Sequence, residues 1–195
     1  GYHWVDANRL AVYLLDVSGH GMGAALLSVS LSNVLRSQSL PHTDFSDPAA
    51  VLRQLNRSFP MEKNNYLLFT MWYGVYDRSS QKLTYASGGH PPAVLIEEPP
   101  PAAQHRLTTA GPVLGCDPAA TFSNQSCAVR PGSRLYVYSD GAYEIEQPDG
   151  STALMEDLIG QLGPPAAPDH SKLDALIAWA EGIGVQTAFE DDVSL

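Results

Sequence analysis

The chain has 195 residues and a formal net charge of −10, with 44% hydrophobic and 16% charged residues. These values are typical of a globular protein and exclude a disordered chain. The acidic balance argues against nucleic-acid binding, which depends on Lys and Arg side chains that neutralise phosphates. We expect one domain over residues 1–195. We expect no membrane span, because no apolar run approaches the required length of about 20 residues.

The two cysteines, Cys116 and Cys127, are too few for a disulfide framework. They fit a reducing, cytoplasmic location better, and the opening residues do not have the pattern of a signal peptide. If an acidic protein of this kind binds a phosphate group, it needs positive charge from a source other than its own Lys and Arg side chains. Metal ions are the obvious supply.

Hydrophobic periodicity predicts strands and helices in blocks along the chain. Runs rich in β-branched and aromatic residues indicate strands. The expected strands are 2–5, 10–15, 66–76, 82–87, 93–96, 105–109, 121–129, 134–138 and a last one from about residue 192. Apolar residues at helical spacing indicate helices over 22–38, 152–162 and 169–182, and a further one that begins at Asp47-Pro48.

This order of elements predicts an α+β fold. Strands come in runs and helices in separate pairs, so the helices are expected to pack outside antiparallel sheets. The proline-rich stretch 97–104 is short enough to be a loop between strands. The sequence contains no internal repeat.

Aspartate recurs at the ends of sheet elements. Asp16 ends the apolar run within "LLDVSGHGMGAALLS", and Asp140 ends the strand within "LYVYSDGAYE". Asp191 and Asp192 lie at the start of the last strand in "FEDDVSL". Carboxylates that converge without Lys or Arg repel one another unless cations lie between them. An all-oxygen set of this kind suits Mg²⁺ or Mn²⁺. A single aspartate is more often a turn or cap residue, but aspartate at the ends of three separate sheet elements favours a metal site.

A loop with three glycines, Gly19, Gly21 and Gly23, follows Asp16, and other interpretations of this loop fit less well. Residues 19–24 match G-x-G-x-x-A, but a dinucleotide site also needs an acidic residue at the end of a second parallel strand, about 20 positions on. Asp44 and Asp47 fall in a loop instead. A histidine-kinase-type ATPase carries similar glycine boxes, but its asparagine-bearing helix before the first box is absent. A cysteine-nucleophile phosphatase needs Cys-x₅-Arg, and neither cysteine has it.

Four motifs in order, "DVSGHGMGAALLS", "YASGGHPPAVL", "YSDGAYE" and "EDDVSL", resemble the metal-dependent (type 2C) protein serine/threonine phosphatases. The resemblance is to the bacterial SpoIIE/RsbU-like branch and covers residues 10–195. It implies a four-layer α-β-β-α sandwich, with two antiparallel sheets flanked by helices. It also implies a centre of two Mn²⁺ or Mg²⁺ ions at one end of the sheets.

The resemblance assigns the ligands motif by motif. Asp16 is similar to the aspartate that bridges both metals, and the backbone carbonyl of Val17 is its partner ligand. Asp140 resembles the second carboxylate ligand and Asp191 the third. These three aspartates are also the expected catalytic residues, because the ions they hold would activate a water to attack the phosphoester.

Three further residues stand at motif positions with less definite roles. Asp192 either caps or orients its neighbour. His20 matches the position of a loop histidine, and its role as a general acid is left open because the loop spacing differs from that of eukaryotic relatives. His90 lies in the family's "SGGHPP" loop, where a structural role is favoured over a chemical one.

The resemblance also suggests a substrate and partners. In this branch the substrate is typically a phosphoserine or phosphothreonine on a small regulatory protein of the STAS type, an anti-sigma-factor antagonist. A receiver or other sensor domain is expected upstream. We therefore predict a phosphoprotein phosphatase. The alternative is a phosphatase-like binding module, without catalysis, that sequesters a signalling partner.

One departure from the family concerns the ends of the chain. Members carry a further metal-binding aspartate in a Gly-Asp motif on the strand that precedes the first one readable here, and no residue of this chain matches it. The sequence starts just downstream of that motif, and Asp6 lies in the turn beyond it and is not a substitute. We expect a domain truncated at both ends, in which the missing aspartate lowers metal occupancy and activity.

Overall fold

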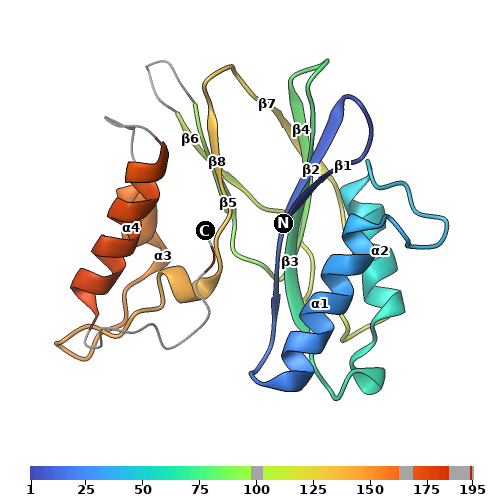
Figure 1. Cartoon of the computed structure of the whole chain (residues 1–195), viewed down its shortest axis with the longest axis horizontal. Helices are drawn as coiled ribbons and strands as arrows, with labels where there is room; N and C mark the ends of the chain where they lie inside the picture. Colours follow the sequence, from blue (N-terminus) through green and yellow to red (C-terminus); the bar gives the residue numbers. More distant parts are fainter. Residues whose placement is uncertain (98–102, 163–168, 185–193, 195) are drawn as a thin grey trace. The chain divides into compact units, whose positions relative to one another are not determined.

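The computed structural model describes residues 1–97, 103–162, 169–184 and 194 (Figure 1). They form four α-helices, two short 3₁₀ turns and eight strands. The helices are α1 Met22–Arg36, α2 Pro48–Ser58, α3 Met155–Gln161 and α4 Asp169–Ile183. The strands are β1 Tyr2–Trp4, β2 Arg9–Val17, β3 Phe69–Asp77, β4 Lys82–Gly88, β5 Ala93–Ile96, β6 Gln104–Leu107, β7 Gln125–Ala128 and β8 Arg134–Tyr136. None of the described helices combines the length and the apolar character needed to cross a membrane.

The chain divides into two compact units. The first unit comprises residues 1–92 and 107–130, and the second comprises residues 93–106 and 131–195. The expectation of a single domain over 1–195 stays a prediction. The α+β class is confirmed, because the described residues form two antiparallel sheets together with four helices.

The first unit is built on a five-stranded antiparallel sheet in the order β1-β2-β3-β4-β7. Strand β2 pairs with β3 along its whole length, from Arg9 opposite Asp77 to Val17 opposite Phe69. Strands β3 and β4 form an antiparallel hairpin, with Asp77 opposite Lys82 next to the turn. Helices α1 and α2 cover one face of this sheet (Figure 1).

Alternation along the strands explains which face is buried. Ala11, Tyr13 and Val17 of β2 pack into the core with the apolar side of α1. Successive side chains of a strand point to opposite faces, so the residues between them face away from the helices. The helix contributes buried residues at helical spacing, which are Ala24, Leu27, Leu31 and Leu35.

Helix α2 begins where the sequence predicts. The side chain of Asp47 accepts a hydrogen bond from the backbone N–H of Ala50 at 3.1 Å, and Pro48 occupies the first helical position. This cap satisfies one of the N–H groups that a helix start leaves unpaired. Asn124 strengthens the cap, because its amide donates to the Asp47 carboxylate at 2.6 Å.

The second unit has its own sheet and core. Strands β6, β5 and β8 form a three-stranded sheet in that order. The buried residues Val94 and Ile96 of β5 pack with Leu158 and Ile159 of α3 and with Leu176 of α4. The predicted helices over 152–162 and 169–182 are confirmed with small shifts of their ends.

Several predicted strands are longer than those observed. The strand expected over 66–76 begins at Phe69, because Asn65 and Tyr66 adopt positive φ angles of 54° and 58° that break an extended chain. The strand expected over 121–129 covers Gln125–Ala128 only. The last strand, expected from about residue 192, lies outside the described residues. Cys116 and Cys127 form no disulfide bond.

Strand β1 brings a histidine into an aromatic cluster. The His3 ring lies 5.8 Å from Tyr13, 6.2 Å from Phe45 and 6.4 Å from Tyr73, measured between ring centroids. Neither imidazole nitrogen has a hydrogen-bond partner among the described residues. Burial lowers the pKa of His3, because these surroundings favour the neutral ring.

This surrounding predicts a loss of stability in mild acid. A histidine whose folded pKa is depressed contributes fully above its unfolded pKa of about 6.5, and this contribution is lost as the pH falls below that value. We expect the free energy of unfolding to fall between about pH 7.5 and pH 5.5, and His3→Phe to remove part of this fall. Urea unfolding of both proteins at the two pH values measures it. His42→Gln, at an exposed histidine, is the control, and an unchanged pH dependence in His3→Phe would contradict the prediction.

Candidate functional site

Asp16 lies near the end of β2, on the face of the sheet opposite to the helices. It is the penultimate residue of the strand and pairs with Thr70 of β3. Its neighbour Val17 is buried in the core that α1 and α2 cover. Because side chains alternate along a strand, the Asp16 side chain points to the other face, where it is half-buried. A core strand therefore delivers a carboxylate to its own end.

The backbone carbonyl of Val17 lies outside the ladder between β2 and β3. Ser18 donates its N–H to the carbonyl of Leu68 at 2.8 Å, so the even-numbered residues of β2 bond toward β3. Tyr13 donates its N–H to the carbonyl of Gly1 at 2.8 Å, so the odd-numbered residues bond toward β1. Among the described residues no strand pairs with β2 beyond Tyr13 on that side. The Val17 carbonyl can therefore bind a ligand without breaking the sheet.

The loop after β2 uses two glycines for their backbone angles. Gly19 has φ +81° and Gly21 has φ +91°, in the region that side chains rarely adopt. A Cβ at Gly21 would meet nothing within 4 Å, so the requirement there is the angle and not space. With ψ −168°, Gly21 lies in a region almost restricted to glycine. It is also the N-cap of α1.

Asp140 belongs to the second unit and opens a 3₁₀ turn, Asp140–Ala142. The preceding strand was expected to run to residue 138 but ends at Tyr136. The half-buried Asp140 carboxylate accepts a hydrogen bond from the N–H of Gly141 at 3.0 Å. Burial, and then the charges of Glu144 and Asp140, raise the pKa of Tyr143 to about 12. This phenol therefore stays protonated beside the carboxylate at neutral pH.

The remaining expected ligands lie outside the described residues. These are Asp191 and Asp192. Within the described part of the chain, His, Cys, Asp and Glu side chains form no group of three that could hold a metal ion. Asp16 is in the first unit and Asp140 in the second. In the first unit the possible donors are the Asp16 carboxylate and the Val17 carbonyl, and such hard oxygen ligands fit Mg²⁺ or Mn²⁺.

The two motif histidines differ in their surroundings. His20 is exposed in the loop after β2, and a role for it in catalysis stays a prediction. His90 is only 5% exposed, and its Nδ1 lies 2.8 Å from Oγ1 of Thr70. This buried position agrees with the structural role that the sequence favours.

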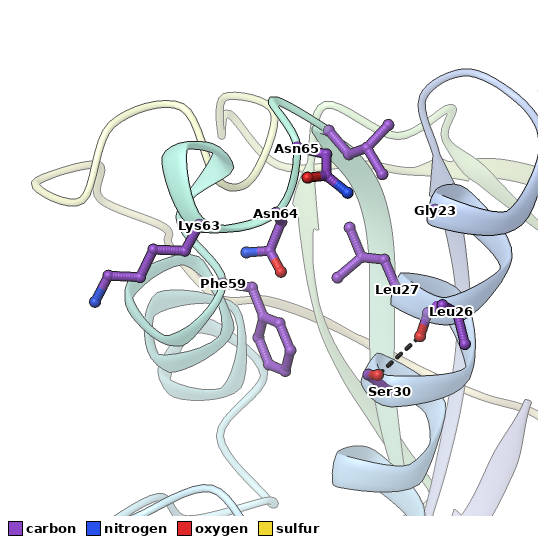
Figure 2. Close-up of a pocket in the computed structure, with 9 residues that line it drawn as sticks. Gly23, Leu26, Leu27, Ser30, Phe59, Lys63, Asn64 and Asn65 are labelled. Carbon is purple, nitrogen blue, oxygen red and sulfur yellow. Dashed lines mark hydrogen bonds between the residues drawn. The ribbon is translucent and has the colours of Figure 1, made fainter.

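A small pocket beside the glycine loop is a feature that periodicity does not predict. It has a volume of about 190 Å³ and lies between α1 and the segment that leads into β3 (Figure 2). Leu27, Phe59 and Leu67 supply apolar walls, and Asn65 and Lys63 add polar groups. Pockets for small-molecule ligands usually measure about 300–1,000 Å³. This one is smaller, so we assign it no ligand.

Comparison with known proteins identifies a family. Residues 6–195 match the family model described as stage II sporulation protein E (SpoIIE). The chain is 28% identical over 177 residues to the phosphoserine phosphatase RsbP of Bacillus subtilis, covering 89% of this chain and 42% of that protein. It is 29% identical over 150 residues to the phosphoserine phosphatase RsbU of the same organism, covering 76% of this chain and 44% of that protein. The chain thus spans less than half the length of these relatives.

Solved structures share the fold. A structure of the RsbU and RsbW domains of a Mycobacterium tuberculosis protein is 26% identical, with a TM-score of 0.74 over 99% of this chain and 53% of that one. The SiaA-PP2C domain of Pseudomonas aeruginosa is 17% identical, with a TM-score of 0.80 over 99% of this chain and 76% of that one. A structure of RsbX in complex with magnesium has a TM-score of 0.67 at 16% identity, over 96% of this chain and 79% of that one. These likenesses confirm the predicted fold class.

The glycine loop gives a prediction that separates the site from the core. Gly21→Val forces a β-branched residue into a glycine-only conformation, which costs about 1–3 kcal/mol and displaces the loop after Asp16. We expect it to weaken Mn²⁺ binding by about 10-fold or more. Leu31→Ala removes a fully buried side chain of α1 and should lower the free energy of unfolding by about 2–5 kcal/mol, with little change in Mn²⁺ binding.

Calorimetric Mn²⁺ titration and urea unfolding of both variants provide the measurements. If Gly21→Val bound Mn²⁺ as well as the wild type does, the loop would be a simple connection.

Proposed function

This chain belongs to the SpoIIE family, the RsbU/RsbP-like branch of PP2C-type serine phosphatases, and from this premise we propose that it hydrolyses phosphoserine or phosphothreonine on a regulatory protein. The reaction class is supported by two relatives that are named phosphoserine phosphatases.

The observation that carries the proposal is the end of β2. A core strand there presents the Asp16 carboxylate on the face away from the helices, together with the Val17 carbonyl on an edge without a paired strand among the described residues. Gly19 and Gly21 then turn the chain away through backbone angles that side chains rarely adopt. A purely structural turn needs neither a carboxylate at this position nor a carbonyl on an edge where the described residues pair no strand.

We infer, from the motif resemblance, that Asp16, the Val17 carbonyl, Asp140 and Asp191 are the residues that would hold two Mn²⁺ or Mg²⁺ ions. Bound divalent cations lower the pKa of a water and offset charge on phosphoryl oxygens. The three carboxylates keep these cations in place, and their hard oxygen atoms suit them. Asp16, Asp140 and Asp191 are thus the proposed catalytic residues.

Other groups of this chain have supporting roles. Asp16 lies near the end of a strand and Asp140 opens a 3₁₀ turn, so the backbones of these two carboxylates are held by regular structure. The N–H of Gly141 orients one oxygen of Asp140 and leaves the other for a ligand. Tyr143, whose pKa is raised to about 12, remains a neutral donor near Asp140 and adds no negative charge.

We further propose a substrate of the STAS type, an anti-sigma-factor antagonist, and a receiver or sensor domain elsewhere in the full-length protein. This proposal follows from the motif resemblance, and one relative of known structure carries an RsbW domain in addition to its RsbU domain. Two cysteines that form no disulfide bond fit a reducing cytoplasm as the place of action.

Substitution of Asp140 tests the proposal. Asp140→Asn removes a negative charge with little change of volume, so the protein should fold while phosphate release from a phosphoserine protein falls by about 100-fold or more. Release should also stop when Mn²⁺ and Mg²⁺ are chelated and return when Mn²⁺ is added. The assay uses the natural full-length protein that contains this chain, with phosphate release measured colorimetrically.

The matched control is Asp149→Asn, at an exposed aspartate of the same unit whose carboxylate bonds to Ser151. It should leave phosphate release unchanged. Activity that survives both chelation and Asp140→Asn would overturn the metal-dependent mechanism. If the full-length protein bound a phosphorylated partner but released no phosphate at any Mn²⁺ concentration, the non-catalytic binding module would be the correct function.

A further inference from the structure

Buried polar residues gather at the turn after β4. Five polar or charged residues are buried in the described part of the chain, and three of them, Ser87, His90 and Thr109, lie in one place. A buried polar group destabilises a protein unless it is hydrogen-bonded, so a cluster of them forms a network that holds one arrangement.

The network joins the turn to the segment 109–111. The hydroxyl of Ser87 donates to the carbonyl of His90 at 3.1 Å, and the N–H of Ser87 donates to Oγ1 of Thr109 at 2.8 Å. The N–H of Gly89 donates to the carbonyl of Gly111 at 3.0 Å.

The turn is also tightly packed. Gly89 has φ +66°, and a Cβ there would lie 2.7 Å from the side chain of Val113 and 3.1 Å from its backbone. A Cβ at Gly111 would lie 2.3 Å from the carbonyl oxygen of Ser87. The turn therefore has little freedom to shift, and His90 is held in one position.

The imidazole of His90 reaches from this turn to β3. Its Nδ1 lies 2.8 Å from Oγ1 of Thr70. A backbone bridge between Gly89 and Met71 fastens the same part of β3. Thr70 is in turn the residue of β3 directly opposite Asp16 of β2. Directly opposed residues have side chains on one face of a sheet, with Cβ atoms about 4.5–5.5 Å apart.

We propose that His90 is a positioning residue for Asp16 and acts through Thr70. The pair Asp16 and Thr70 is next to the last pair of the β2–β3 ladder, where strand ends fray most readily. The hydrogen bond between His90 and Thr70 holds the Thr70 side chain, and with it this end of β3, to the turn after β4. Fraying that would move Asp16 is thereby suppressed. This inference rests on the proposed function, because it takes Asp16 to be a metal ligand.

The chemistry of the two groups fits this role. A threonine hydroxyl has one donor and two acceptor sites, so Thr70 can bond to the imidazole and still offer a site on the face it shares with Asp16. The distance from His90 to Thr70 is that of a well-formed hydrogen bond. Partners of this kind, one step behind a ligand, typically change metal affinity about 10- to 100-fold when removed.

Two matched pairs of variants test the role. Thr70→Val removes the hydroxyl and keeps the shape, whereas Thr70→Ser keeps the hydroxyl. His90→Leu removes the hydrogen bond, whereas His90→Asn places an amide close to where Nδ1 lies. We expect Thr70→Val and His90→Leu each to weaken Mn²⁺ binding by about 10- to 100-fold, and the conservative variants to restore most of it. The double variant should be no weaker than either single one, because the two side chains act as one unit.

A control separates positioning from general destabilisation. Asn56 is a buried residue of the same unit whose amide donates to the carbonyl of Asp117 and accepts from the N–H of Gly115. Asn56→Ala should lower the melting temperature but leave Mn²⁺ affinity at the wild-type value. If Asn56→Ala weakened Mn²⁺ binding as much as Thr70→Val, or if Thr70→Val bound Mn²⁺ like the wild type, the positioning role would be overturned.

A readout without metal keeps this inference distinct from the proposed function. In the metal-free protein, Thr70→Val should speed hydrogen exchange at the backbone amide of Ser18, which bonds to Leu68 at the end of the ladder, more than Asn56→Ala does. Equal exchange in the two variants would overturn the positioning role. A wild-type protein that binds Mn²⁺ but hydrolyses no phosphoserine would overturn the proposed function, while the binding and exchange measurements would still decide the role of His90.

Discussion

The pairing of β2 with β3 is the constraint on which the first unit depends. All nine residues of β2 have a partner in β3, and the outer strands and both helices build on this pair. The register of this pair determines which side chains face the helices, because a shift of one residue would turn every side chain to the opposite face. Asp16 would then point into the apolar core and Val17 would point out of it. The buried stripe that holds the helices thus also fixes where the carboxylate points.

Charge gives the second constraint. The chain carries a net charge of −10, and its strand ends present aspartates that would repel one another if they were brought together without cations. The carbonyl of Val17, a proposed ligand, would add a neutral oxygen and so increase the number of ligands without more repulsion. A set of this kind is weakly stabilised without cations and gains from binding them, so metal binding and local order at these strand ends should be coupled.

Local patterns predicted much of this fold, and their failures have physical causes. The alternation in β2, the helical spacing of Leu27, Leu31 and Leu35, and the cap at Asp47 each act within a few residues, so they can be recognised in the sequence. Strand β3 starts later than expected because Asn65 and Tyr66 adopt positive φ angles, which cannot be recognised from the sequence at non-glycine residues.

The candidate site was predictable only in part, because some of its contacts join residues that are far apart in the sequence. The glycine loop, with its positive φ angles at Gly19 and Gly21, agrees with its motif. The contact from His90 to Thr70 joins residues far apart in sequence, and neither periodicity nor a motif specifies such a partner. The buried network around Ser87 needs the register of three segments at once.

A neutral support behind Asp16 suits a proposed metal ligand better than a charged one. A Lys or Arg beside Asp16 would hold the carboxylate strongly, but its positive charge would repel a cation bound by the same group. It would also leave a costly buried charge whenever the carboxylate turned toward the metal. The Thr70 hydroxyl carries no charge, so it can restrain its strand and offer a hydrogen bond without competing for the ligand. In this way Thr70 would help the sheet to hold the carboxylate through geometry without adding a charge next to the proposed cation site.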